Sequence, residues 1–335
     1  MPFISTEIKP PADCRAAQMY YVSKADAPLA ASTPLAYLNI EDRDYSMNDR
    51  LKCKDRLIYK DSRDIFKEVE AGGVCFLEIP LIGDTQIVRH GFSTRHGGVS
   101  VGMYSSMNLG FGRGDSRQAV QENFSRMAKA LGVTTESIVF SRQTHTTNVR
   151  TVGQQDRGKG LEKETDYRDV DGLITNVPEA CLATFYADCV PLYFVDPVKK
   201  AIGLSHSGWR GTVGKIGKIT IERMTEEYGT NPEDVIGAIG PSICQECYEV
   251  SEDVIKQFQN VFAATQWDRL FYQKANGKYQ LNLWCANQLI LEEAGMRREN
   301  IAVTNLCTCC NDSILFSHRA SGGKRGNLGA FLGIV

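Results

Sequence analysis

Two histidines and one cysteine stand where they could hold a catalytic metal ion. They are His145 in SRQTHTTNV, Cys189 in YADCVPLYF and His206 in LSHSGWRGT. Each lies at the end of an apolar run, and loops at strand ends are where α/β proteins place functional groups. Two imidazoles and a thiolate form a common catalytic zinc set, with a fourth position left for water or substrate. Their spacing matches no zinc signature, so a buried structural cysteine with two hydrogen-bonded histidines stays open as the alternative.

Three glycine-rich segments carry arginines that could bind an anion such as phosphate. In GWRGT, Arg210 stands just before a predicted helix, whose first N–H groups and dipole would favour a phosphate. Arg95 precedes a glycine pair in STRHGGVS, and SHRASGGKRGNLG could form a basic lid with Arg319, Lys324 and Arg325. A guanidinium can bind phosphate through two hydrogen bonds. The alternatives are a structural turn in GWRGT and solvated charges in the other two segments.

Two cysteine pairs are a second possible metal site. Cys244 and Cys247 are separated by two residues in CQEC, and Cys307, Cys309 and Cys310 follow in CTCC about sixty residues later. That separation is longer than in a zinc ribbon, so the sequence does not favour a four-thiolate zinc site. The chain also lacks the H-x-E and P-C-x-x-C signature of nucleobase deaminases. A Walker loop and a dinucleotide-binding fingerprint are absent as well.

Alternating strand and helix patterns from residue 72 onward must position these side chains. Apolar or β-branched runs predict strands in VCFLEIPLI, SIVFSRQTH, CLATFYADCVPLYFV, AIGLSHSG, VIGAIGP and IAVTNLC. Helical periodicity predicts helices over about 116–131, 213–228, 251–262 and 283–294, three of which stop at a glycine. The apolar stripes of these helices are expected to face the core. The predicted fold class is α/β with mixed sheets.

Composition excludes several classes of function. The chain has 335 residues, a net charge of −2 and a pI near 6.3, which leaves no electrostatic footprint for nucleic acid or anionic membrane. No apolar run reaches the ~18 residues of a membrane span, and the N-terminus does not resemble a signal peptide. Eleven cysteines without a secretory signal are typical of thiols in a reducing cytosol. We therefore expect a cytoplasmic protein with no nucleic-acid or membrane partner.

The first seventy residues differ from the rest of the chain. Residues 1–70 are charge-dense and have only short apolar runs. We expect a small N-terminal appendage there, and both a poorly ordered and a folded state stay open. A single main domain, the catalytic one, is expected over 71–335. The patterns do not predict an oligomeric state.

Taken in order, the motifs resemble those of the laccase-domain or polyphenol-oxidase-like family over about 72–335. This family is also labelled peptidoglycan editing factor and multi-activity purine nucleoside phosphorylase. The matching segments are TRHGGVS, MNLG, QTHTTNV, DGLIT, ADCVPLYF, HSGWRGT, IGPSICQECYEV, LCTCC and FSHRASGGKRGNLGAFLGI. The resemblance implies a layered αββα fold with mixed β-sheets. One departure is Ser207, where the family often has alanine.

The resemblance also implies a site. Its metal ligands would be His145, Cys189 and His206, with zinc as the expected ion and copper as the alternative. The expected catalytic residues are Cys189, His206, Asp171 and Arg95, and the expected phosphate-binding residues are Arg95, Arg210 and Arg319.

Three reactions fit such a site. The expected one is zinc-dependent phosphorolysis of a purine nucleoside: adenosine, inosine or methylthioadenosine. Phosphate held by Arg95 and Arg210 would attack C1′, releasing the base and ribose 1-phosphate. Metal-activated water attacking C6 of adenine would give an adenosine deaminase side activity. Asp171 and His96 are candidates for protonating the departing purine.

The other two reactions belong to different classes. One is copper-dependent oxidation of phenols, because two histidines and a cysteine can hold copper. Five histidines are, however, too few for the copper centres of a conventional multicopper oxidase. The other is a cysteine hydrolase or amidase acting on peptidoglycan precursors, with Cys189 as nucleophile and His206 as base. Bound zinc would argue against it, because a zinc-bound thiolate is a poor nucleophile.

Overall fold

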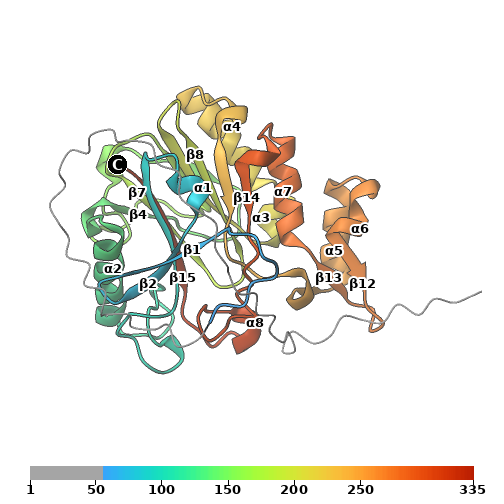
Figure 1. Cartoon of the computed structure of the whole chain (residues 1–335), viewed down its shortest axis with the longest axis horizontal. Coiled ribbons are helices and arrows are strands. Elements are labelled where there is room, and N and C mark those ends of the chain that lie inside the picture. The colour runs from blue at the N-terminus through green and yellow to red at the C-terminus, as the bar shows by residue number, and fades with distance from the viewer. Residues whose placement is uncertain (1–55) are drawn as a thin grey trace, which may run out of the picture. The chain divides into compact units, whose positions relative to one another are not determined.

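In the computed structural model, the described part of the chain is residues 56–335. Its elements stack in four layers, α–β–β–α: two six-stranded sheets pack on each other, and helices cover both outer faces (Figure 1). This arrangement confirms the predicted α/β fold with layered αββα architecture and mixed sheets. The part of the expected appendage before residue 56 lies outside the described residues.

The first sheet has the strand order β1–β2–β3–β15–β7–β4. Neighbouring strands are antiparallel except β7 and β4, which are parallel. The expected division at residue 71 falls inside β1, and Leu57 and Phe66 are already buried in the core of the domain. The strands are β1 (Lys67–Ala71), β2 (Val74–Glu78), β3 (Val88–Ser93), β4 (Ile138–Phe140), β7 (Cys181–Tyr186) and β15 (Leu328–Ile334).

The second sheet has the order β14–β10–β8–β9–β6–β5 and is antiparallel in its centre. Both edge pairs, β10 with β14 and β5 with β6, are parallel. Its strands are β5 (Val149–Thr151), β6 (Gly172–Thr175), β8 (Val190–Asp196), β9 (Ala201–Ser207), β10 (Ile236–Ile239) and β14 (Ile301–Val303). A small third sheet contains β11 (Glu249–Val250), β13 (Tyr279–Leu281) and β12 (Phe271–Gln273).

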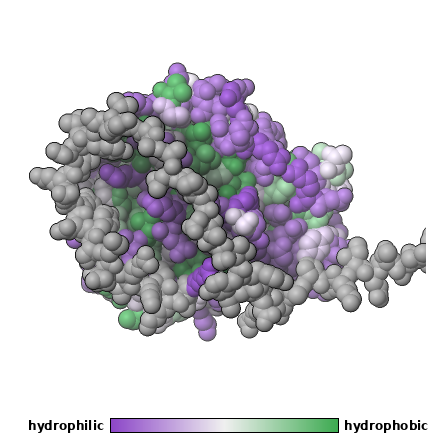
Figure 2. All heavy atoms as spheres, viewed as in Figure 1, coloured by the Kyte–Doolittle hydropathy of each residue, from purple (hydrophilic) through white to green (hydrophobic). Residues whose placement is uncertain are grey.

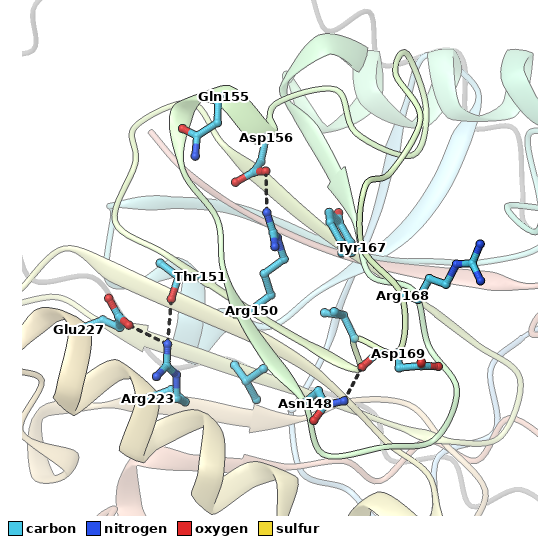
Figure 3. A pocket seen from close by; sticks show the side chains of 12 residues that line it. Asn148, Arg150, Thr151, Gln155, Asp156, Tyr167, Arg168, Asp169, Arg223 and Glu227 are labelled. Atoms are coloured by element: carbon cyan, nitrogen blue, oxygen red, sulfur yellow. Dashed lines mark hydrogen bonds and ion pairs between the residues drawn. The ribbon is translucent and has the colours of Figure 1, made fainter.

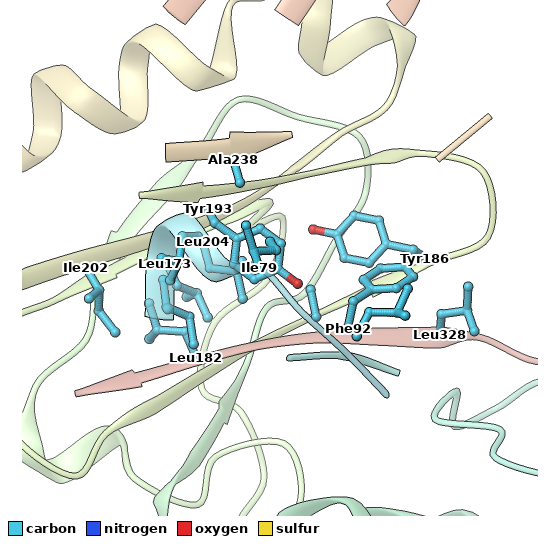
Figure 4. Close-up of a cluster of buried hydrophobic side chains, with 14 of the residues drawn as sticks. Ile79, Phe92, Leu173, Leu182, Tyr186, Tyr193, Ile202, Leu204, Ala238 and Leu328 are labelled. Carbon is cyan, nitrogen blue, oxygen red and sulfur yellow. The ribbon is translucent and has the colours of Figure 1, made fainter. Parts of the chain in front are cut away.

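The main core lies between the two large sheets (Figure 4). Phe92 and Leu182 of the first sheet meet Tyr193 and Leu204 of the second, and all four are fully buried. The Tyr193 hydroxyl donates to the carbonyl of Gly91 at 3.3 Å, so the one polar atom of this side chain is paired across the sheets. Each fully buried side chain of this size contributes about 1.5–3 kcal/mol.

Helices close the two outer faces. On the first sheet lies α2 (Arg117–Leu131), which begins at the side-chain cap of Ser116 and ends at Gly132 in the left-handed conformation. Helices α4 and α7 cover the second sheet, and their outer surface carries mostly hydrophilic residues (Figure 2). The other helices are α1 (Pro80–Gly83), α3 (Trp209–Val213), α4 (Ile216–Tyr228), α5 (Glu252–Val261), α6 (Trp267–Leu270), α7 (Leu283–Glu293) and α8 (His318–Ser321).

The helix predicted over 213–228 starts differently from the prediction. Helix α4 begins only at Ile216, the separate short helix α3 ends at Val213, and Lys215 between them has a φ of 58°. A continuous α-helix cannot include a left-handed residue, so the chain turns there. The turn lets α3 lie directly at the end of β9. No described helix is both long and apolar enough to cross a membrane.

Candidate metal centre

His145, Cys189 and His206 meet at one end of the second sheet. One ligand atom of each lies within 4.8 Å of the other two. Strand pairing explains two of the positions: His206 is near the end of β9, and Cys189 precedes β8, its antiparallel partner. His145 lies on the crossover from the first sheet to the second, between β4 and β5, with a φ of 65°. Its ring centre is 4.9 Å from that of His206.

Asp171 holds both histidines in place. Its carboxylate accepts a hydrogen bond from His206 Nδ1 at 2.8 Å, which leaves His206 Nε2 for a metal. The carboxylate also accepts from the backbone N–H groups of Thr144, His145 and Thr146. Burial favours the protonated form, but these hydrogen bonds outweigh burial and lower the pKa of Asp171 to about 2. The group is therefore an ionised orienting residue at neutral pH.

The two imidazoles differ in their electrostatics. Burial opposes a charge on His206, but the negative charge at Cys189 and the contacts with Asp171 raise its pKa to about 9. Burial and the positive charges of His206 and Arg210 lower the pKa of His145. Because metals bind neutral imidazole, a metal ion entering this centre would displace a proton from His206.

Gly208 provides the space that the ligand atoms occupy. A Cβ atom on this residue would lie 2.7 Å from His145 Nδ1 and 3.2 Å from Cys189 Sγ. The space, the three donor atoms and the carboxylate behind His206 fit a catalytic zinc ion with one open position. Copper accepts the same donor types, so the donor set alone does not identify the metal.

A buried polar network surrounds Ser207, the residue that follows His206. Ser207 Oγ lies 2.9 Å from both Thr212 Oγ1 and Asn287 Oδ1. Asn287 in turn donates to Thr212 at 3.2 Å and to a backbone carbonyl of its own helix. The hydroxyl of Ser207 thus joins β9 to α3 and α7, a connection that alanine could not make.

Asp188, directly before Cys189, is a residue that the sequence analysis missed. It is 8% exposed and has a φ of 86°. Its carboxylate accepts from Thr308 Oγ1 and from the backbone N–H of Arg319, both at 2.7 Å, and its carbonyl accepts from Ile243 N at 3.0 Å. The acidic residue beside the cysteine in the ADC segment was the available signal. Asp188 fixes the backbone that presents Cys189.

Two predicted phosphate-binding arginines lie close to the centre. The guanidinium of Arg319 is 5.6 Å from the ring centre of Tyr248, and that of Arg210 is 4.3 Å from the ring of Trp209. Burial and the charge at Cys189 raise the pKa of Tyr248, whereas the charges of Arg319 and Arg210 oppose this rise. Tyr248, another residue that the sequence analysis missed, therefore lies among the cysteine and both arginines.

The remaining predicted residues lie in a neighbouring loop. Arg95 donates to the carbonyls of Ser105 and Asp312 at 2.8 and 2.7 Å, and its guanidinium stacks 4.6 Å from the ring centre of Phe316. These contacts join two loops. His96, the second candidate proton donor, is half-buried beside Arg95. The structure thus gives Arg95 contacts with backbone carbonyls and an aromatic ring.

Arg325 is a further cation of the site. Burial and the nearby charge of Arg113 lower its pKa to about 10, although the charges at Asp188 and Cys189 oppose this shift. Its buried Nε has no hydrogen-bond partner among the described residues. A buried guanidinium with an unused donor is suited to an anionic ligand.

A separate pocket of about 650 Å³ is lined by residues of the segment that follows His145, among them Asn148 and Arg150 (Figure 3). Two of its arginines are paired with acidic residues that also line it: Arg150 with Asp156 at 3.1 Å, and Arg223 with Glu227 at 2.6 Å. None of the three candidate metal ligands lines it. The pocket and the candidate metal centre are therefore separate sites.

The chain is similar to known proteins over most of the described residues. Residues 89–335 match the sequence profile of the family described as multi-copper polyphenol oxidoreductase laccase. The chain belongs to this laccase-like family. The family resemblance inferred from the ordered motifs is therefore confirmed.

Relatives within the family carry several names. The chain is 40% identical over 245 residues to the purine nucleoside phosphorylase YlmD of Bacillus subtilis, covering 73% of this chain and 87% of the relative. An adenosine deaminase from an unknown prokaryotic organism is 34% identical, with 72% and 92% covered. The crystal structure of YfiH from Bacillus licheniformis superposes with a TM-score of 0.76 at 35% identity, over 82% of this chain and all of that one.

Proposed function

We propose that the protein is a zinc-dependent purine nucleoside phosphorylase acting on adenosine, inosine or methylthioadenosine in the cytoplasm, with an adenosine deaminase side activity. The observation that carries the proposal is the three-donor centre beside a cationic surface. Ligand atoms of His145, Cys189 and His206 lie within 4.8 Å of one another, and Arg210 and Arg319 stand next to them. The names of the two relatives, a purine nucleoside phosphorylase and an adenosine deaminase, support a nucleoside as substrate.

In phosphorolysis, each residue of the site has a separate role. A phosphate oxygen bonds to C1′ while the bond from C1′ to the purine nitrogen breaks, and the purine takes up a proton. Arg210 and Arg319 hold the phosphate and offset its charge, and Arg95 keeps the adjoining loops in position. Asp171 orients His206, since its hydrogen bonds keep it ionised, and this leaves His96 as the candidate proton donor. A zinc ion supplies a Lewis acid that can polarise a substrate oxygen or lower the pKa of a water.

The test is a paired assay of activity and metal content on one protein sample. Each of the three nucleosides is incubated with and without phosphate, products are identified by mass spectrometry, and bound metal is quantified. We expect phosphate-dependent formation of ribose 1-phosphate and free base. Cys189→Ala should lose the metal of this centre and lower the rate by about 100-fold or more, because a ligand is removed. The fold, monitored by circular dichroism, should be retained.

Arginine variants test the phosphate site. Arg319→Gln should raise the KM for phosphate about tenfold and leave the KM for nucleoside nearly unchanged. Arg297→Gln is the matched control, because Arg297 pairs with Glu233 on the surface, 2.6 Å away, and touches none of the site residues. Zinc-loaded protein that turns over none of the nucleosides would refute the proposal. Hydrolysis of a peptidoglycan precursor by metal-free protein would favour the cysteine hydrolase, and phenol oxidation by copper-loaded protein alone would favour the oxidase.

A further inference from the structure

We propose that Cys244, Cys247, Cys307 and Cys310 bind a second zinc ion, with a structural role. The four sulfur atoms lie within 4.8 Å of one another, and those of Cys247 and Cys310 are 3.5 Å apart. In a tetrahedral zinc site with Zn–S bonds of about 2.3 Å, the sulfurs are about 3.8 Å apart. Small side-chain adjustments therefore suffice to bind one ion. An iron–sulfur cluster would need the sulfurs further apart, because its iron core lies between them.

Strand pairing brings the two cysteine pairs together in spite of their separation in the sequence. β10 and β14 are parallel neighbours, with Ile239 opposite Val303. The pairing continues beyond both strands, where Ser242 forms a parallel bridge with Cys307. The turns that follow two adjacent parallel strands leave the sheet at the same edge. The segment CQEC after β10 consequently meets the segment CTCC after β14.

The local backbone is arranged to support thiolates. The N–H groups of Cys244 and Cys310 both point at Cys307 Sγ, with N–S distances of 3.2 and 3.4 Å. Backbone N–H donors stabilise a negatively charged sulfur, as in other thiolate–metal sites. Cys244 and Cys307 are at most 1% exposed, whereas Cys247 and Cys310 are half-buried. Cys244 and Cys307 would therefore bind the ion from the protein interior, and the ion could enter the site from the solvent side, past Cys247 and Cys310.

The proposed ion would fix two loops that belong to the candidate active site. Ile243 and Thr308, each next to a cysteine of the cluster, hydrogen-bond the backbone and the carboxylate of Asp188. Tyr248 directly follows Cys247. Four protein ligands leave no open coordination position, so the ion would be structural and not catalytic. It would hold the segments that position Asp188 and Tyr248 beside Cys189.

Metal quantification on the full-length protein, purified under reducing conditions, tests this proposal. Wild-type protein should hold about two zinc ions per chain. The double variant Cys247→Ser, Cys310→Ser should hold one fewer, since it removes two ligands and keeps the buried pair. Cys285→Ser, a half-buried cysteine of α7 outside the cluster, is the matched control and should keep both ions. Thermal unfolding should shift down by several degrees in the double variant only.

A second measurement needs no change in the cluster itself. The variant Cys189→Ala has no thiolate left in the His145 centre. If cobalt then replaces the zinc that remains bound, any thiolate-to-cobalt absorption must come from the four-cysteine cluster. We expect the strong charge-transfer bands of a cobalt ion bound by several thiolates. Unchanged zinc content in a folded double variant, or cobalt spectra without thiolate bands, would overturn the proposal. So would a Cys247–Cys310 disulfide, found by mass spectrometry of unreduced wild-type protein, in place of the metal. These readouts are independent of nucleoside turnover, so they separate this proposal from the proposed function.

Discussion

At the scale of single residues, the metal centre depends as much on a missing side chain as on the three that are present. Gly208 lies opposite Cys189 at the end of the β8–β9 pair, and its φ of −73° is one that any residue can adopt. Its requirement for glycine is therefore one of space. A methyl group there would press on His145 Nδ1, since the contact of 2.7 Å is shorter than ordinary packing allows.

We expect Gly208→Ala to lower zinc affinity about tenfold or more, because His145 must move away from the other ligands. Competition with a chromophoric chelator measures the affinity. Gly211→Ala is the control: it adds the same methyl group to the same helix, but its nearest neighbour, the carbonyl of His206, is 3.4 Å away. Equal losses in both variants would mean that the effect comes from α3 as a whole.

At the scale of elements, a buried histidine ties β3 to the start of α1. His90 Nε2 lies 2.8 Å from the backbone nitrogen of Ile79 and 3.1 Å from the carbonyl oxygen of the same residue, so it either accepts or donates a hydrogen bond there, depending on the tautomer. The side chain is 5% exposed, and burial lowers its pKa to about 4. Burial therefore disfavours protonation of His90 in the folded state, because a charged imidazolium there would lose its contact with water.

The pH dependence of stability follows from this shift. Above the unfolded-state pKa of about 6.5, His90 is neutral in both states and the connection is intact. As the pH falls from 6.5 towards 4, the unfolded chain binds the proton first, and about 3 kcal/mol of unfolding free energy is lost by pH 4. Urea unfolding of chelator-treated protein at pH 7 and pH 4 measures this loss. His90→Gln should lose about 3 kcal/mol less over the same interval, and identical losses would contradict the assignment.

The arrangement of strands and helices also explains how much of the fold and of the candidate site could be predicted from the sequence. His145, Cys189 and His206 could be selected because each ends an apolar run, and such ends are easy to recognise. The cysteine cluster was not favoured, because its formation depends on β10 pairing with β14 in parallel, which no local pattern encodes. The break at Lys215 in a predicted helix could not be foreseen either, because a lysine in the sequence does not indicate a left-handed backbone conformation.

Individual contacts within the site were beyond prediction for another reason. Asp188 and Tyr248 are common residue types in loops, and they gain a role only when Thr308 and Arg319 arrive from the end of the chain. The three arginines were selected by their glycine-rich surroundings. Those surroundings are as compatible with the backbone contacts of Arg95 as with phosphate binding.

At the scale of the whole molecule, the described domain should unfold as one unit. The two sheets share a continuous core, and helices on each side pack on sheets that contribute to it. The three tryptophans, Trp209, Trp267 and Trp284, all pack against the core cluster that lies under the helices of the second sheet. Their fluorescence reports one side of the molecule, whereas far-UV circular dichroism reports all of it.

We expect both signals to change at the same urea concentration in chelator-treated protein. Leu182→Ala, in the first sheet and fully buried, should move both transitions together by about 2–5 kcal/mol, although no tryptophan lies in that sheet. The exposed Val198→Ala is a control that should move neither transition by more than about 0.5 kcal/mol. A shift in circular dichroism alone would show that the layers unfold separately.

The position of β15 in the middle of the first sheet affects how the protein is made. β15 lies between β3 and β7, both of which leave the ribosome well before it. Until β15 has been synthesised, the first sheet consists of two halves with unpaired edges and an uncovered apolar face. Such surfaces bind chaperones or aggregate with neighbouring chains. Slow translation of the segment before β15 would lengthen this exposed period, so the protein should depend on chaperones during its synthesis more than its finished architecture suggests.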